Sequence, residues 1–173
     1  MASTLKVDTL QGQSVAGTSV TITGGTINST PVGATTVSTG AFSSVSATTT
    51  LKSSGATSGI GYATGAGGSV TQLTSRTTGV TLNTICGSIT THTASLAAED
   101  KATFTVTNSA VAIGDVIVTA QRSGSNGGMT QVEVVAVAAG SCDIKVLNNN
   151  AAAGTAETVA IIINFAVIKV VTA

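Results

Sequence analysis

In the first third of the chain, apolar positions return irregularly within a stretch that carries no charge. No charged residue lies between Asp8 and Lys52, and most positions there are Thr, Ser, Gly, Ala or Val. The larger apolar residues that recur in this stretch include Val20, Ile22, Ile27, Val32, Val37, Phe42, Val45 and Leu51. They are too few to fill a core of their own, so they need another polypeptide to cover them. We therefore expect residues 1–52 to form an extended assembly arm.

The arm carries the contacts that we expect to join the protein to its assembly. Pro31 removes a backbone donor and Gly24-Gly25 favours a turn, so long regular strands are not expected there. Fully extended, these residues reach on the order of 150 Å, enough to lie across a neighbouring subunit or to wind round sister chains. The predicted attachment and inter-chain contact residues are Thr4, Leu5, Val7, Leu10, Val20, Ile22, Ile27, Val32 and Phe42.

The pattern changes after a junction. Residues 53–68 are dense in glycine and are predicted to be flexible. In residues 69–173, short segments of alternating apolar and polar positions are separated by turn residues; Phe104 and Val106, for example, alternate with threonines. The predicted strands are Val70 to Arg76, Val80 to Cys86, Ser88 to Thr93, Ala102 to Asn108, Asp115 to Arg122, Thr130 to Ala138, Cys142 to Leu147 and Thr158 to Val171.

Eight strands at this spacing are typical of an all-β fold, here a β-sandwich domain that follows the extended arm. A jelly roll is the leading variant, and a small Greek-key barrel is the alternative. Only Ala94 to Asp100 is expected to form a helical turn.

Composition indicates a protein that lives in an assembly. Hydrophobic residues make up 42% of the chain and aromatic residues only 2%, so the core is expected to be thin and built mostly from Ala, Val and Ile. Charged residues make up 8%, against about 25% in a typical soluble domain, and the net charge is zero. Free monomers of this kind would not repel one another. The lysines and arginines are scattered singly, which argues against a nucleic-acid partner.

Neither a secretory signal nor a membrane span is predicted. The opening residues MASTLKVDTLQG lack the apolar core of a signal peptide, so synthesis in the cytoplasm is expected. The strongly apolar run from Val159 to Ile168 is about half as long as a membrane-spanning helix, and Asn164 and Lys169 lie in or beside it. We expect this run to be a buried strand and expect no membrane partner.

Few residues offer catalytic or metal-binding chemistry. Three copies of the single histidine, His92, on a trimer axis would offer a metal ligand set, but a surface or hydrogen-bonded histidine is the favoured interpretation. Cys86 and Cys142 are too far apart for a CxxC motif and are expected to be small buried thiols, with a disulfide between facing strands as the alternative. Glu99 and Asp100 are adjacent, so their side chains point apart and suit a solvated turn. The sequence predicts no enzyme, no cofactor and no metal site.

Three phrases of the sequence resemble segments of bacteriophage virion proteins. GGTINSTPVGATTVSTGAFSSVSATTTL resembles modules of tail fibres and of proteins that stand on capsids. GIGYATGAGGSVTQLTSRTTGVTLNTICGSIT and IIINFAVIKVV resemble a compact C-terminal domain of such phage structural proteins, and together the phrases cover most of the chain. The resemblance implies a structural virion component, which in such families is usually a homotrimer.

The function expected from these observations is that of a capsid decoration, or cement, protein. A homotrimer made in the host cytoplasm would grip the major capsid protein with its N-terminal arms, project its β-sandwich from the capsid exterior and stabilise the shell. The alternative is a short tail fibre or receptor-binding protein whose arm forms an intertwined shaft. The capsid role is favoured because the chain is short for a shaft and its outward domain is poor in aromatic residues.

Overall fold

The computed structural model describes residues 44–53, 56–57, 59–126, 128–151 and 155–170. The chain divides into two units, Met1–Leu51 and Lys52–Ala173. Of the first unit only residues 44–51 are described; they are exposed or nearly so and contain neither helix nor strand. The predicted arm contacts from Thr4 to Phe42 therefore lie outside the described residues.

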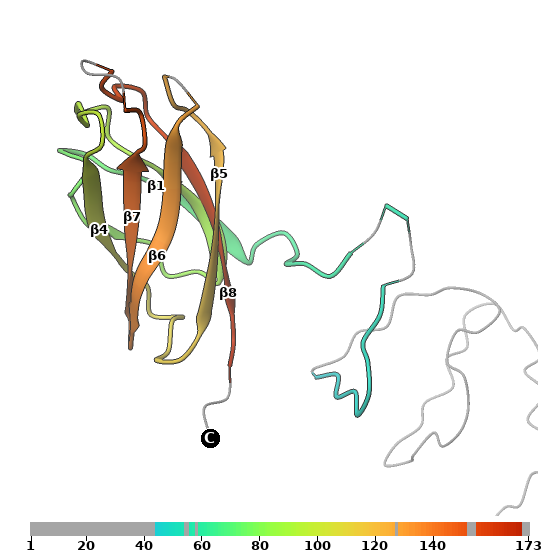
Figure 1. Ribbon diagram of the computed structural model, residues 1–173. Helices are drawn as coiled ribbons and strands as arrows, with labels where there is room; N and C mark the ends of the chain where they lie inside the picture. Colours follow the sequence, from blue (N-terminus) through green and yellow to red (C-terminus); the bar gives the residue numbers. More distant parts are fainter. Residues whose placement is uncertain (1–43, 54–55, 58, 127, 152–154, 171–173) are drawn as a thin grey trace, which may run out of the picture. The chain divides into compact units, whose positions relative to one another are not determined.

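The second unit is all-β (Figure 1), and its described residues contain eight strands and no helix. The strands are β1 Gly67–Thr71, β2 Val80–Thr81, β3 Cys86–Thr90, β4 Lys101–Thr107, β5 Val116–Ser123, β6 Thr130–Ala138, β7 Ser141–Asn148 and β8 Ile162–Ile168. They form two four-stranded sheets, sheet A in the order β1-β3-β8-β5 and sheet B in the order β2-β4-β7-β6.

Both sheets are mixed. The pairs β1–β3 and β2–β4 are parallel, whereas the other neighbours are antiparallel. A jelly roll is built from antiparallel strands, so these two parallel pairs depart from the predicted jelly-roll variant. The coarser prediction of an all-β domain with two facing sheets is confirmed.

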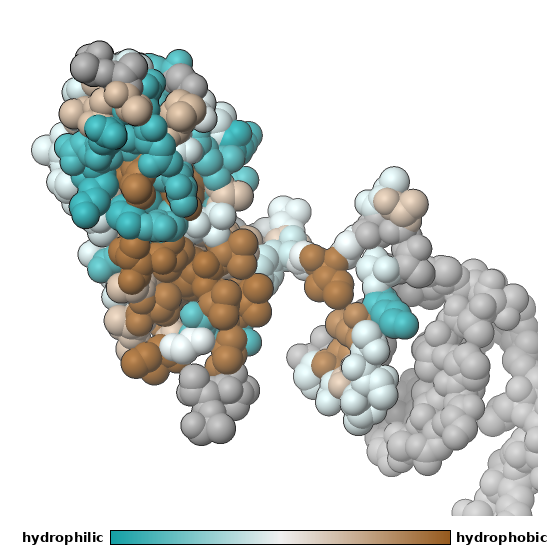
Figure 2. All heavy atoms as spheres, viewed as in Figure 1, coloured by the Kyte–Doolittle hydropathy of each residue, from teal (hydrophilic) through white to brown (hydrophobic). Residues whose placement is uncertain are grey.

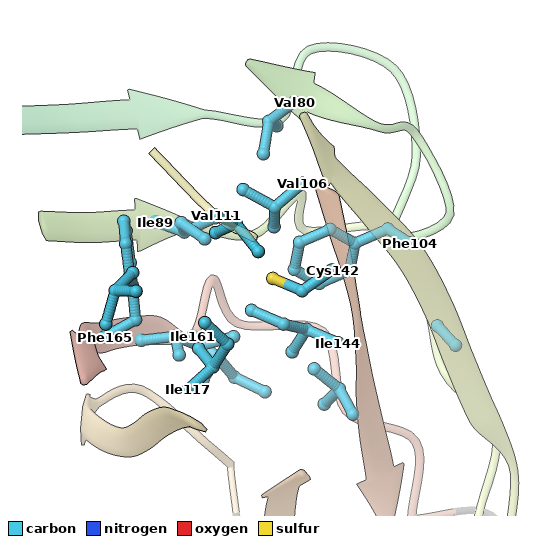
Figure 3. Packing of buried hydrophobic residues seen from close by; sticks show 14 of the residues in the cluster. Val80, Ile89, Phe104, Val106, Val111, Ile117, Cys142, Ile144, Ile161 and Phe165 are labelled. Atoms are coloured by element: carbon cyan, nitrogen blue, oxygen red, sulfur yellow. The ribbon is translucent and has the colours of Figure 1, made fainter. Parts of the chain in front are cut away.

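One hydrophobic core lies between the two sheets (Figure 3). In β4 every second side chain is buried, which places Phe104 and Val106 inside and the threonines outside, as the alternation predicted. The same alternation in β8 buries Ile163, Phe165 and Val167 from the other sheet. Aside from the two phenylalanines, the core consists of aliphatic residues and the small thiol of Cys142, in agreement with the composition.

The bounds of β4, β5, β6 and β7 agree with the prediction to within one residue, whereas those of the other strands differ by more; β8, for example, covers Ile162–Ile168 where Thr158 to Val171 was predicted. β6 spans Thr130–Ala138, as predicted. β1, in contrast, begins at Gly67 within the predicted junction and ends at Thr71, well before Arg76. β2 covers only Val80–Thr81, although a strand was expected to continue to Cys86.

The helical turn predicted for Ala94 to Asp100 is wrong. Leu96 instead forms an isolated antiparallel bridge with Glu157. The Leu96 N–H donates to the Glu157 carbonyl at 3.0 Å, and the Glu157 N–H donates to the Leu96 carbonyl at 2.8 Å. Because these bonds join residues far apart in the sequence, local propensity could not reveal them.

A buried arginine ties together the loops around this bridge. Arg76 is 4% exposed, and its Nε donates to the Ala94 carbonyl. Its Nη1 donates to Thr91 Oγ1 at 3.2 Å, and its Nη2 donates to the carbonyls of Glu157 and Val159 at 3.1 and 2.9 Å. Burial lowers the pKa of the Arg76 guanidinium, and the charge of Glu157 acts in the opposite direction. One side chain therefore joins its own loop to two others, residues 91–94 and 157–159, a role that the scattered basic residues of the sequence did not indicate.

Candidate functional site

The outer faces of the two sheets differ in chemistry. The strands of sheet B contain several charged residues, among them Glu133, Asp143 and Lys145. Glu133 pairs with Lys145, and Asp143 accepts a hydrogen bond from Thr105 Oγ1 at 2.7 Å. The strands of sheet A contain a single charged residue, Arg122, near the end of β5. Sheet B therefore carries paired charges, whereas the strands of sheet A carry no charge apart from Arg122.

Exposed apolar residues of sheet A come from β5 and β8. The alternation of β5 buries Ile117 and turns Val116 and Val118 outward, where they are 49% and 48% exposed. Antiparallel pairing places Val116 opposite Ile168 and Val118 opposite Ala166. Residues directly opposite on one face of a sheet have neighbouring side chains, so these four outward residues form one continuous surface.

The segment before β1 extends this surface and forms a groove with it. The Tyr62 hydroxyl donates a hydrogen bond to the Val167 carbonyl in β8. Beside this bond lies a groove of about 490 Å³, lined by Ile60, Gly61, Tyr62, Ala166, Ile168 and Lys169. We define the apolar face as Ile60, Tyr62, Val116, Val118, Ala166 and Ile168.

Figure 2 shows hydrophobic residues gathered over the lower half of the strand domain, where β5, β6 and β8 lie in Figure 1, and hydrophilic residues over the upper half. This lower half includes β6 of sheet B, and the register of sheet A gives a similar gradient on its own outer face. Further along the strands, Ser69 pairs with Ser88, and Ser88 pairs with Asn164. The outer face of sheet A therefore changes from aliphatic at the start of β5 to hydroxyl and amide groups toward the other end.

A single ion pair lies beside the groove. The Asp115 carboxylate accepts hydrogen bonds from the Lys169 ammonium, from the Ala112 N–H at 2.8 Å and from the Val170 N–H at 3.3 Å. The Lys169 bond, with smaller contributions from the backbone bonds, lowers the pKa of Asp115. Because the two charges are paired within the chain, the rim of the apolar face carries no net charge from them.

Neither cysteine is part of a disulfide. Cys86 and Cys142 are free thiols in different sheets, so the pairing considered from the sequence is not formed. Burial raises the pKa of the Cys142 thiol to about 11, and the charge of Asp143 acts in the same direction.

His92 is a hydrogen-bonded histidine, since its Nδ1 accepts a hydrogen bond from the Ala94 N–H at 2.9 Å. Across the described ranges, no three His, Cys, Asp or Glu residues are grouped so as to hold a metal ion. The same ranges contain no helix that is long and apolar enough to cross a membrane.

The apolar face was missing from the residues predicted to make contacts, which lie between Thr4 and Phe42 and outside the described part of the chain. Its signal was nevertheless present in the sequence. The run from Val159 to Ile168, apart from Asn164, and the start of β5 are apolar at successive positions, which is typical of strands covered on both sides. The sequence predicts a buried strand for this run, but in β8 Ile168 is 51% exposed. Only the core-facing side chains of β8 are buried along the whole strand.

Comparison of the protein with family models, with curated proteins and with solved structures gave no match. The resemblance to bacteriophage virion proteins therefore stays a prediction.

Proposed function

We propose that the protein is a structural component of a bacteriophage virion and acts as a capsid decoration protein. The observation that carries this proposal is the apolar face, whose rim charges are neutralised within the chain. Continuous exposed apolar surfaces are typical of contacts between proteins. Three phrases of the sequence resemble segments of virion proteins, which indicates a virion as the assembly in which such contacts form.

In this role the arm of residues 1–52 attaches the protein to the outer surface of the major capsid protein. An extended segment that carries no charge between Asp8 and Lys52 can add to exposed strand edges through its backbone, with Val20, Ile22 and the other predicted contact residues filling apolar pockets. Three arms joined in one homotrimer bind more tightly than one, because the second and third arms bind at a high effective concentration. Binding to the assembled shell alone stabilises the shell by mass action.

Deletion of residues 1–51 tests this function. The buried core extends from Val80 to Val167 and lies within the second unit, so the truncated chain is expected to keep the far-UV circular dichroism of its strands. It is expected to lose cosedimentation with purified shells that lack the protein, whereas the full chain, assayed in parallel, binds. Normal binding of the truncated chain would show that the arm is not the attachment element.

Copy number separates the capsid role from the tail-fibre alternative. A gel of purified virions with hundreds of copies per particle supports decoration. A few dozen copies or fewer would assign the protein to the tail.

A further inference from the structure

Within the described residues β5 is an edge strand of sheet A, and one half of it lacks the features that protect such edges. The second half carries Arg122 and a register shift between Gln121 and Ser123. Charges and bulges discourage an edge from pairing with a foreign strand. The first half, Val116 to Ala120, contains no charge, no proline and no register shift. This unprotected half carries Val116 and Val118 of the apolar face.

Sheet A is also apolar on both of its sides at this end. Ile117 and Val167 face the core and are 8% and 0% exposed, whereas the outward Val116, Val118 and Ile168 are about half exposed. Strands of this kind are typical of sheets that are covered on both faces. The segment around Tyr62 supplies only part of the outer cover, because the groove of about 490 Å³ lies open between it and β8. The unprotected edge and the partly covered face adjoin, so one partner can satisfy both.

We propose that this partner is a second copy of the chain, so that the apolar faces of the copies meet around the symmetry axis of the homotrimer. When a surface meets its own copy around a symmetry axis, uncompensated like charges are brought together and oppose association. The apolar face avoids this cost because Asp115 and Lys169, which lie beside it, neutralise each other within each chain. The net charge of zero also removes repulsion between whole chains. A partner that carries a net charge would find no complementary charge on this face.

The inference rests on the proposed function, because a homotrimer requires that copies of the chain associate. It places contacts between copies in the strand domain, in addition to those expected from the arm.

The test measures the mass of the full chain in solution by sedimentation equilibrium. The wild type is expected to have three times the single-chain mass of 16.7 kDa. Val118→Lys is expected to weaken association by roughly 100-fold or more, since it places like charges in a desolvated contact. The matched control is Leu73→Lys, which adds the same charge at a residue that is 85% exposed and follows β1 at the hydroxyl-rich end of sheet A. This control is expected to keep the wild-type mass.

A second variant keeps the test decisive if one substitution perturbs folding. Val118→Glu is expected to be dissociated by itself, and an equimolar mixture with Val118→Lys is expected to regain association, because opposite charges then meet. Circular dichroism checks each variant, and both are expected to fold because Val118 points outward.

The outcomes distinguish this inference from the proposed function. If the Val118 variants keep the wild-type mass, or if Leu73→Lys dissociates equally, the apolar face is not the contact between copies, and the homotrimer itself is untouched. If the wild type is a single chain, both the inference and the homotrimer are wrong. Attachment by the arm is judged separately, by cosedimentation of the truncated chain.

Discussion

Replacement of Arg76 by alanine is expected to destabilise the strand domain by about 3–5 kcal/mol. The guanidinium supplies donors to the carbonyls of Ala94, Glu157 and Val159 and to the Thr91 hydroxyl. Hydrogen bonds to charged groups contribute about 1.5–3 kcal/mol each, but the four are not additive, and burying the guanidinium itself costs free energy. The range of about 3–5 kcal/mol is instead taken from proteins in which one partner of a buried charged pair was removed.

Urea unfolding of the full chain, followed by far-UV circular dichroism, measures this difference in the free energy of unfolding. In a thermal scan, about 4 °C per kcal/mol for a domain between about 100 and 150 residues corresponds to a fall in Tm of about 12–20 °C. Arg122→Ala is the matched control, because Arg122 is exposed on β5 and its removal is expected to change stability by less than about 0.5 kcal/mol.

Arg76→Lys separates the charge of the residue from its geometry. A lysine ammonium keeps the charge but lacks the planar fork of donors that reaches acceptors on several loops, so an intermediate loss of stability is expected. The reasoning is refuted if Arg76→Ala and Arg122→Ala unfold within about 1 kcal/mol of each other.

Two further predictions concern titratable groups. A maleimide added to the native protein near neutral pH is expected to modify Cys86 and spare Cys142, because Cys142 is buried and its pKa is raised to about 11, which leaves little thiolate; equal modification of both peptides in a mass spectrum would contradict this. The lowered pKa of Asp115 means that it stabilises the fold above its unfolded-state value near 3.8, and this contribution is lost as the pH falls through the folded-state pKa. Asp115→Asn should therefore have a lower Tm at neutral pH and a flatter fall of Tm toward about pH 2; parallel curves for the variant and the wild type would disprove the role of this carboxylate.

Local pattern accounts for the parts of the fold that sequence analysis predicted well. The alternation of apolar and hydroxyl residues in β4 and the bounds of β6 depend only on residues near in sequence. Several wrong predictions, among them the end of β1, the length of β2 and the helical turn, lie between Gln72 and Asp100. There the chain is held by the donors of Arg76 and by the bridge between Leu96 and Glu157, which join segments far apart in sequence. Residues that are neighbours in sequence do not indicate such contacts.

The same division applies to the candidate site. The sequence by itself determined that the second unit is all-β, that its core is mostly aliphatic and that β5 and β8 carry apolar side chains on both sides. The tertiary structure decided which of those side chains are covered. Pairing of Cys86 with Ala166 and of Val116 with Ile168 places β8 between β3 and β5 and leaves β5 at the edge. Alternation is a local property of a strand, whereas the neighbours that cover it are selected by long-range pairing, so the exposure of Val118 became known only from the folded chain.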